Sequence, residues 1–320
     1  MEISVVVPSH DRPLRLRWLL NALQQQTLAA ERWELVVADD SSGEEAEELL
    51  RTHPLAQSGR MRSLRFEPGT AGSGHKRNAG WRAAKAPLIA FTDDDCRPPE
   101  DWLERALAAA RAHPGAIVQG ATAPDPVEEV IAKHAPHVHT QSIWPPVPWA
   151  QTCNIVYPRE VLERAGGFPE DAFGGEDTIL AARARDAGTP YIGAPEVVTY
   201  HAVYEASLWE MVRSAWRWRD LPLMIKQYPS LRREFPMYIF WKREHALLPF
   251  ALLGWWQMRR TRLAALLALP YIAHVLPKKH GQHPRGRIRA ASELPGWTVL
   301  YLAEFAALVW GSVKHRKLFL

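Results

Sequence analysis

The chain has 320 residues, enough to bury one large hydrophobic core or two moderate ones. Hydrophobic residues make up 47% and charged residues 23%, a balance typical of globular proteins and not of disordered chains. The two cysteines, Cys96 and Cys153, exclude a disulfide framework and a four-cysteine zinc site, and they fit a reduced cytosol.

Charge divides the chain into two unlike parts. Residues 1–201 carry 20 basic and 28 acidic side chains, a net charge of −8, whereas residues 202–320 carry 19 basic and 7 acidic side chains, a net charge of +12. The basic part favours an anionic partner. We therefore expect two domains, an α/β domain over residues 1–205 and a basic, apolar helical region over residues 206–320.

The first part of the chain reads as alternating strands and helices. Residues 1–5 lack the basic and long apolar regions of a signal peptide, so we expect a first strand at residues 3–7. Further strands are expected near residues 33–38, 62–66 and 88–91, with helices at 14–26 and from Glu44 onward. This alternation predicts a mostly parallel sheet with helices on both faces.

Polar loops follow these strands, at the edge where open α/β sheets bind ligands. Asp39 ends the second strand and can accept hydrogen bonds from a base or ribose. The segment 72–74, with two glycines, lets the backbone approach a ligand, and Lys76 and Arg77 supply positive charge for a diphosphate. Its glycine spacing matches neither the P-loop nor the dinucleotide fingerprint, and ordinary turn chemistry is the alternative for each loop.

Three consecutive carboxylates, Asp93, Asp94 and Asp95, end the fourth strand. Adjacent carboxylates repel one another, and keeping them ionised in a cleft is costly unless a cation lies among them. Oxygen ligands of this kind suit Mg²⁺ or Mn²⁺, which usually also bind substrate phosphates. The sequence therefore suggests a metal-bound nucleotide diphosphate. The alternative is a solvated acidic turn that caps the following helix.

These motifs together resemble family 2 glycosyltransferases of the GT-A fold. The resemblance rests on the order and spacing of four segments and covers residues 2–201; the segments are VVVPS at 5–9, VVADDS at 36–41, KRNAG at 76–80 and FTDDD at 91–95. It implies a sugar donor activated by a nucleotide diphosphate (UDP, GDP or dTDP), and a DxD motif that binds Mn²⁺ or Mg²⁺.

The resemblance also implies roles for individual residues. Asp95 would be the main metal ligand with Asp93 nearby, and His201, placed after the last core strand, would be a third ligand. A lone histidine is more often structural. The following residues are expected to line the nucleotide: Pro8, Ser9, Asp11, Arg12, Asp39, Asp40, Gly74, Arg77, Asn78, Asp93 and Asp94.

A second acidic motif, Glu176 and Asp177, opens an amphipathic segment at 179–187 and looks like the family's ED motif. A carboxylate at a helix N-terminus should have a lowered pKa and stay ionised at pH 7. With the resemblance, Asp177 is expected to be the general base and Glu176 an acceptor or orienting contact; a capping role is the alternative. Asn154 and Trp149 are expected to border the acceptor pocket.

The basic part contains three apolar runs, at residues 246–256, 263–276 and 297–313, flanked by the basic clusters Arg259–Arg260–Arg262, Lys278–Lys279 and 314–317. None is a clean span of about 20 apolar residues. Tryptophans and basic residues beside apolar runs suit helices lying in an anionic membrane interface, so we expect a cytoplasmic protein that binds the inner face of the membrane. A soluble subdomain or a homo-oligomer contact is the alternative, and no nucleic-acid-binding module is recognised.

The sequence therefore predicts a metal-dependent, inverting glycosyltransferase, with inversion taken from the resemblance. Two alternatives stay open. A sugar nucleotidyltransferase also joins an α/β sheet to a metal and a diphosphate. A membrane-surface scaffold could keep a vestigial nucleotide site.

Overall fold

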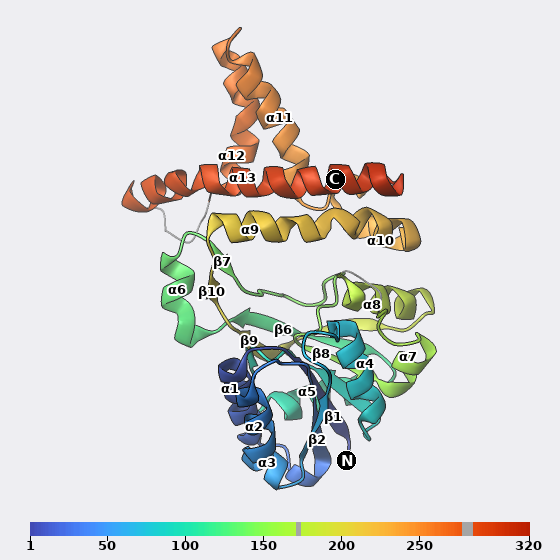
Figure 1. Cartoon of the computed structure of the whole chain (residues 1–320). Coiled ribbons are helices and arrows are strands. Elements are labelled where there is room, and N and C mark those ends of the chain that lie inside the picture. The colour runs from blue at the N-terminus through green and yellow to red at the C-terminus, as the bar shows by residue number, and fades with distance from the viewer. Residues whose placement is uncertain (171–173, 277–283) are drawn as a thin grey trace. The chain divides into compact units, whose positions relative to one another are not determined.

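A computed structural model of the protein describes residues 1–170, 174–276 and 284–320 (Figure 1). Contacts divide the chain into two compact units. Unit 1 comprises Met1–Glu129 and Thr140–Val203, and unit 2 comprises Val130–His139 and Tyr204–Leu320. The acidic part of the sequence thus contributes one short segment, Val130–His139, to the basic unit.

Unit 1 is built on an eight-stranded sheet in the order β3-β2-β1-β4-β8-β6-β9-β5. Its strands are β1 Ile3–Ser9, β2 Trp33–Asp39, β3 Met61–Arg65, β4 Leu88–Phe91, β5 Cys96–Arg97, β6 Ile117–Pro124, β8 Ile155–Pro158 and β9 Tyr191–His201. Strands β1 to β4 pair in parallel, as do β6 and β9, whereas β8 and β5 run antiparallel to their neighbours. The expected mostly parallel sheet is confirmed.

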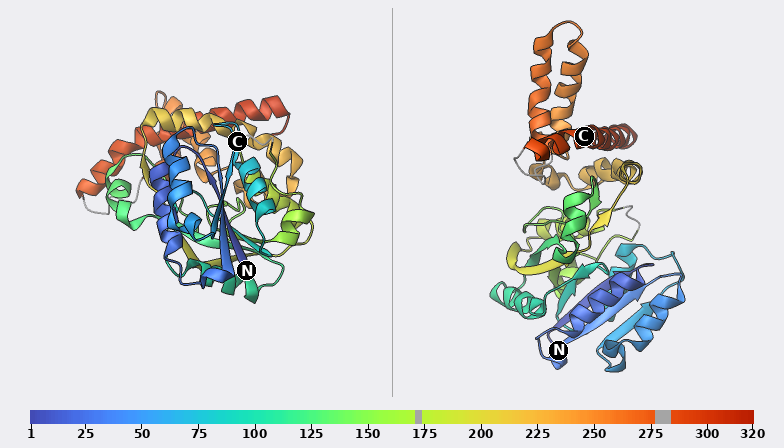
Figure 2. Two further views of the ribbon diagram at one scale, coloured as in Figure 1. Left: turned by 60° about the horizontal axis from the view of Figure 1, so that its bottom comes forward. Right: turned by 90° about the vertical axis from the view of Figure 1, so that its left-hand side faces the viewer.

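Helices cover both faces of this sheet (Figure 2). The longer helices of unit 1 are α1 Pro13–Gln24, α2 Glu44–Thr52, α4 Ser73–Ala83, α5 Trp102–Ala112 and α8 Glu176–Asp186, and the shorter ones are α3 Pro54–Gln57 and α7 Arg159–Arg164. Val5 and Val7 pack on the face covered by α1, α2 and α5, while Val6 packs with Trp81 and Leu180 on the opposite face. Both faces of β1 are therefore buried, as its run of β-branched residues predicts.

Strand register brings the loops of the first four strands together. Ser9 lies opposite Asp39 in the β1–β2 pair, and Val6 lies opposite Phe91 in the β1–β4 pair. Parallel strands in this register end at the same edge of the sheet, so the loops after β1, β2 and β4 are neighbours. The polar residues that follow each strand meet there.

Unit 2 is mainly helical. Its helices are α6 Glu129–His134, α9 Leu208–Ala215, α10 Leu221–Gln227, α11 Arg243–Gln257, α12 Leu269–Val275 and α13 Pro284–His315, joined by 3₁₀ segments that include η3 Trp216–Asp220 and η6 Arg262–Ala268. Strands β7 Val138–His139 and β10 Tyr204–Glu205 form an antiparallel pair. The basic pair Lys278–Lys279 lies outside the described residues.

Helix α13 changes the expectation that no apolar run could span a membrane. The run at 297–313 belongs to a helix of 32 residues that, among the described helices, is long and apolar enough to do so by length and composition alone. The core helix of a water-soluble protein passes the same test. The helical residues 284–296, which precede the run, supply the additional length.

Candidate active site

Two basic side chains hold the loops after β1 and β2 together. The Lys76 ammonium donates to Asp40 Oδ1 at 2.5 Å and to the Ser9 carbonyl at 2.8 Å, and it is almost fully buried. The His10 ring also contacts Asp40 Oδ1 at 3.1 Å. Lys76, expected in a loop, lies in the first turn of α4, because that helix begins at Ser73. Its charge is used to neutralise a buried carboxylate.

Asp39 lies at the end of β2 with no exposed surface. Its Oδ1 accepts from the Ser41 hydroxyl at 2.6 Å, and its Oδ2 pairs with Arg65. Arg65, which the sequence analysis missed, lies opposite Asp39 in the β2–β3 register. The signal in the sequence that could have identified Arg65 is its position as a basic residue at the end of β3, the strand next to β2.

The carboxylates after β4 face inward. Asp94 and Asp95 are nearly buried, Asp93 is about a quarter exposed, and the Arg12 guanidinium lies 3.0 Å from both Asp94 Oδ1 and Asp95 Oδ2. Burial raises the pKa of Asp94 to about 6; Arg12 opposes the rise, and the charge of Asp95 adds to it. The cost expected for adjacent carboxylates is present here, and a solvated acidic turn does not describe this segment.

Asp95 and His201 form a pair suited to a divalent cation. Strand β5 sets His201 opposite Cys96, and His201 Nε2 lies 3.4 Å from Asp95 Oδ1. His201 Nδ1 lies 2.8 Å from the Ala202 carbonyl, so in the neutral ring Nδ1 carries the hydrogen and the Nε2 lone pair faces Asp95. No group of three or more candidate ligands occurs among residues 1–170, 174–276 and 284–320. One carboxylate and one imidazole fit a cation that substrate phosphates and water also coordinate.

Arg77 joins the two acidic motifs. Its guanidinium, 7% exposed, donates to Asp93 Oδ1 at 2.8 Å and to Glu176 Oε1 at 2.9 Å. Burial disfavours its charge, but Asp93 and Glu176 outweigh that cost and raise the pKa of Arg77. The motif after β4 and the start of α8 therefore belong to one site.

Asp177, in the first turn of α8, is partly buried. Its Oδ1 accepts from the Thr178 amide at 2.8 Å. Burial, followed by the negative charge of Glu176, raises the pKa of Asp177 to about 7, although Arg77 opposes the rise. The expectation of a lowered pKa is wrong, because desolvation outweighs the helix dipole. A carboxylate with a pKa near 7 is a stronger base than one that ionises in the usual range.

With this geometry established, comparison with known proteins identifies the family. The sequence model of glycosyl transferase family 2 matches residues 4–168, more than half of the chain. The chain belongs to glycosyl transferase family 2. The family membership and the GT-A-like fold confirm the resemblance that the sequence motifs suggested.

Curated relatives of this family 2 chain are about a quarter identical to it over the matched regions. The glycosyltransferase AglE of Haloferax volcanii is 25% identical over 209 residues, which is 62% of this chain and 66% of AglE. A validoxylamine A glucosyltransferase of Streptomyces hygroscopicus subsp. jinggangensis is 28% identical over 273 residues, 75% of this chain and 63% of that enzyme. The matched region thus spans slightly less than two thirds of these relatives.

Solved structures share the fold. The mannosyltransferase PcManGT from Pyrobaculum calidifontis, in complex with GDP-Man and Mn²⁺, gives a TM-score of 0.60 at 21% identity and covers 98% of this chain and 87% of its own. Residues 1–349 of S. aureus TarS, in complex with UDP-GlcNAc, give 0.54 at 15% identity, with 99% and 93% covered. At these identities the likeness shows the GT-A-like fold alone.

Two residues expected to bind the nucleotide have structural roles in this family 2 chain. The Asn78 amide donates to the Phe168 carbonyl and to Glu170, and its oxygen accepts from Trp81 Nε1 and the Phe168 amide. A Cβ at Gly74 would lie 2.6 Å from the Pro169 carbonyl. Gly74 and Asn78 therefore allow and hold the close approach of the 168–170 segment to α4, a contact between protein segments where a ligand contact was expected.

Asn154 is also a structural residue. It is buried, its amide nitrogen donates to the Ala121 and Val197 carbonyls, and its oxygen accepts from Trp102 Nε1. Both amide hydrogens are used inside the sheet, so neither is left to donate to an acceptor. Trp149 is half-buried, and its carbonyl accepts from the Thr178 hydroxyl at 2.9 Å, so its backbone lies beside the first turn of α8.

The remaining expected residues shape the loop after β1. Pro8 is buried within the strand, opposite Ala38. Asp11 has a φ of 48° and accepts from the Ser42 amide at 2.7 Å, which ties this loop to the one after β2. Aspartate is among the residues that tolerate this left-handed backbone, and such strain is common at functional sites.

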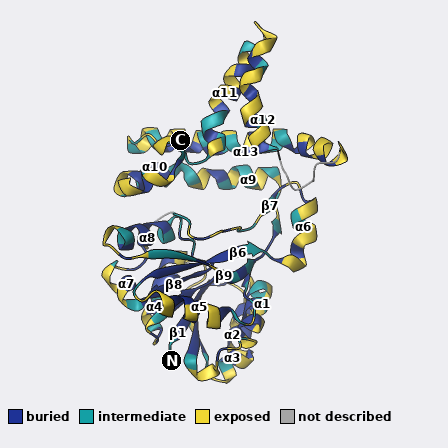
Figure 3. Cartoon of the chain, turned by 180° about the vertical axis from the view of Figure 1, so that it is seen from behind, coloured by how far each residue is buried: buried dark blue, intermediate teal, exposed yellow. Residues whose placement is uncertain are grey.

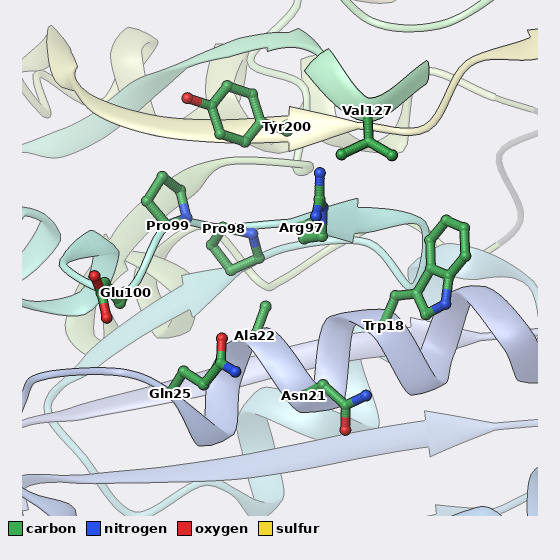
Figure 4. A pocket seen from close by; sticks show the side chains of 10 residues that line it. All are labelled: Trp18, Asn21, Ala22, Gln25, Arg97, Pro98, Pro99, Glu100, Val127 and Tyr200. Carbon is green, nitrogen blue, oxygen red and sulfur yellow. The ribbon is translucent and has the colours of Figure 1, made fainter.

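A pocket of about 510 Å³ lies beside α1 and the segment after β5 (Figure 4). It is lined by Trp18, Gln25, Arg97, Glu100, Tyr200 and their neighbours, and none of the expected site residues lines it. Tyr200 precedes His201 on β9, and successive strand residues point to opposite faces of a sheet. This pocket is therefore separate from the Asp95–His201 pair.

Proposed function

We propose that this family 2 glycosyltransferase transfers a sugar from a nucleotide-diphosphate donor to an acceptor hydroxyl at the edge formed by β1, β2, β4 and α8. The observation that carries the proposal is the ion-pair bridge from Asp93 through Arg77 to Glu176. It joins the carboxylates expected at the diphosphate to the helix that carries the expected base.

The nucleotide of the donor would lie over the loops after β1 and β2. Pro8, Ser9, Asp11, Asp39 and Asp40 contribute to this surface, with Arg12 and Arg77 beside the acidic motif. Sugars activated by UDP, GDP or dTDP are all candidate donors. GDP-Man and UDP-GlcNAc are bound by PcManGT and TarS respectively, and that supports the donor class.

We assign the Mn²⁺ or Mg²⁺ site to Asp95 and His201, with Asp93 nearby. A divalent cation held there supplies positive charge to the two phosphates of the departing group. Asp95 contributes a carboxylate oxygen, and the Ala202 carbonyl fixes the His201 tautomer that leaves Nε2 able to coordinate. PcManGT binds Mn²⁺, which supports a divalent ion.

Asp177 is assigned as the general base. The acceptor hydroxyl transfers its proton to the Asp177 carboxylate as its oxygen bonds to the anomeric carbon, and the bond from that carbon to the diphosphate oxygen breaks. Attack from the face opposite the leaving group inverts the configuration. Arg77 holds Glu176, and with it the first turn of α8, close to Asp93. Trp149 borders the acceptor side through its contact with Thr178.

Family membership favours this reaction over the two alternatives. A sugar nucleotidyltransferase would consume a nucleoside triphosphate and release pyrophosphate, and nothing in the family match supports it. A scaffold with a vestigial site would not bind a nucleotide diphosphate in a metal-dependent way. The raised pKa of Asp177 to about 7 supports a working base.

For unit 2 we propose association with an anionic membrane surface facing the cytoplasm. Its excess of basic over acidic residues supports this assignment. A homo-oligomer contact through the same unit is the alternative. Nucleic acid is not proposed as a partner.

Calorimetric titration with UDP, GDP and dTDP, each with and without Mn²⁺, tests the donor and metal assignments. We expect one nucleotide to bind in a metal-dependent way and Asp95→Asn to lose that dependence. Asp101→Asn is the matched control, because Asp101 is a partly exposed residue paired with Arg105 outside the site. Equal binding with and without metal would refute the metal assignment, and no binding of any nucleotide would refute the proposed reaction.

A further inference from the structure

Helices α11 and α12, with η6 between them, form a hairpin. Its small residues lie between the helices and its large apolar residues face outward, the opposite of the arrangement in a water-soluble hairpin. Along its seam Ala251, Gly254, Ala264 and Ala268 are buried. A Cβ at Gly254 would lie 2.7 Å from the Ala264 carbonyl, so the two backbones are in close contact. Small residues between helices are typical of packing inside lipid, where large apolar side chains gain nothing by facing inward.

The large apolar side chains of this hairpin face outward. Ten of them between residues 250 and 269 are 38% to 74% exposed: Phe250, Leu252, Leu253, Trp255, Trp256, Met258, Leu263, Leu266, Leu267 and Leu269. In the cartoon of Figure 3, many residues of this hairpin have the colour of exposed residues. So large an exposed apolar surface marks an interaction site.

The apolar surface surrounds the hairpin and is not confined to one stripe. At about 100° per residue, the five exposed side chains from Phe250 to Trp256 cover more than half of the circumference of α11. Residues 246–256 contain no polar side chain, and between 263 and 275 His274 is the one strongly polar residue. A helix lying flat in a membrane interface needs a polar face, and α11 has none.

Beyond Glu244, the charge of the hairpin is of one sign. No acidic residue occurs between Glu244 and Glu293, whereas eight basic residues do. Arg259, Arg260 and Arg262 cluster at the tip, and Arg243 lies at the start of α11, after Lys242, which pairs with Glu304. An apolar segment with basic residues at both ends complements an anionic bilayer and would be an unusual partner for a basic copy of the same chain.

The length of the hairpin approaches the thickness of a bilayer. The 15 residues of α11 span about 22 Å, a few ångströms short of a hydrocarbon core of about 27 to 30 Å. Long arginine side chains at the tip can extend the reach to headgroups. Within the turn, the Arg260 and Thr261 amides both donate to the Gln257 carbonyl.

The base of the hairpin is anchored within unit 2. Leu248, Tyr271 and Val275 form a buried cluster with Trp297 and Phe305 of α13. The hairpin extends from α13 toward a free tip in Figures 1 and 2. The outer half of the hairpin, from Phe250 to Leu269, lies beyond these contacts.

We propose that the hairpin Arg243–Val275 inserts tip first into the hydrocarbon core of an anionic bilayer, with Arg259, Arg260 and Arg262 at the far headgroups. This inference rests on the proposed membrane association; it identifies the hairpin as the element that binds the membrane and states how deeply it inserts. It revises the expected mode of binding, in which helices lie in the interface.

Depth-dependent fluorescence quenching tests the insertion. An environment-sensitive probe is attached to Leu253→Cys of the full chain, because the native Cys96 and Cys153 are buried. The protein is bound to vesicles of phosphatidylcholine and phosphatidylglycerol that carry a quencher either at the headgroup or at mid-chain. We expect stronger quenching from mid-chain. Val130→Cys, 69% exposed in α6, is the control and should respond to neither quencher.

Three results would overturn the proposal. Quenching of the Leu253 probe by the headgroup quencher alone would indicate a flat helix. Bound vesicles with no quenching would indicate another anchor. If the Leu253 probe is shielded from water before vesicles are added, and the protein sediments as a dimer, the hairpin would be a contact between copies of the chain.

Charge variants separate this inference from the proposed enzyme. Leu253→Lys with Leu263→Lys should weaken partitioning into vesicles by on the order of a hundredfold or more, whereas Val130→Lys should leave it unchanged. Metal-dependent nucleotide binding should be the same in all of these variants. Unchanged partitioning of the double variant would refute the insertion. Insertion without nucleotide binding in the parent chain would refute the proposed reaction alone.

Discussion

Replacing Asp177 by asparagine should make unit 1 more stable at neutral pH while it abolishes transfer. Burial holds the Asp177 pKa at about 7, against an ordinary value of 3.8. The folded state therefore binds more protons than the unfolded state between these values, so stability falls as pH rises from about 4 to about 7. Asparagine does not titrate, and its side-chain oxygen can still accept from the Thr178 amide.

The size of the effect follows from the shift. About three pH units at 1.36 kcal/mol each give a ceiling of about 4 kcal/mol at pH 8. The substitution also changes the free energy of unfolding by an amount that does not depend on pH. The diagnostic quantity is therefore the stability difference between Asp177→Asn and the parent chain, which should grow with pH and level off above about 7.

Hydrogen exchange of β1 amides, compared between variant and parent at equal pH without nucleotide or divalent ions, measures this difference for unit 1 alone. Asp101→Asn serves as the control, because an exposed ion pair contributes little. A difference that shrinks as pH rises would mean that the folded-state pKa of Asp177 is lowered. That outcome would refute the reasoning and restore the helix dipole as the dominant influence.

Other predictions address the same site. The initial rate of sugar transfer should rise with pH through about 7 and then level off, because Asp177 must lose its proton to act as a base; a rate that is flat from pH 5 to 8 would contradict this. His201→Gln should weaken Mn²⁺-dependent nucleotide binding at least tenfold by calorimetry, and unchanged binding would exclude His201 as a ligand. Asn154→Leu should destabilise unit 1 by about 2 to 4 kcal/mol, because two carbonyls and an indole N–H lose their hydrogen-bond partner. The same exchange measurement checks this, and the folded variant should bind nucleotide normally. Gly74→Ala should cost about 1 to 3 kcal/mol, because its Cβ would meet the Pro169 carbonyl, and no loss of protection would contradict that contact.

The sequence located the strands of the sheet's first half well, because short apolar runs ended by polar loops have few other interpretations. It missed β6, whose residues 117–124 include glycine, glutamine, threonine and two alanines. Gly120 is needed there because a Cβ would meet the Asn154 side chain and the Val197 carbonyl. The antiparallel direction of β8 was also not predictable, since a strand's own residues do not record the direction of its partners.

Site residues were predictable as motifs and less so as chemistry. The three carboxylates after β4 and the pair at α8 were found from their order along the chain. The pKa of Asp177 was not, because its burial depends on segments distant in sequence. The proximity of His201 to Asp95 likewise depends on the pairing of β5 with β9. The roles of all these residues in transfer stay predictions.

The Arg77 bridge has a consequence for how substitutions combine. One planar guanidinium contacts carboxylates that lie 83 positions apart in the chain. Removing either carboxylate leaves the buried Arg77 guanidinium with one of its two ion pairs. Removing the other carboxylate then changes the free energy of unfolding by a different amount from the first removal. Effects of Asp93 and Glu176 substitutions should therefore be non-additive, and a double-mutant cycle would measure the interaction energy between the two motifs.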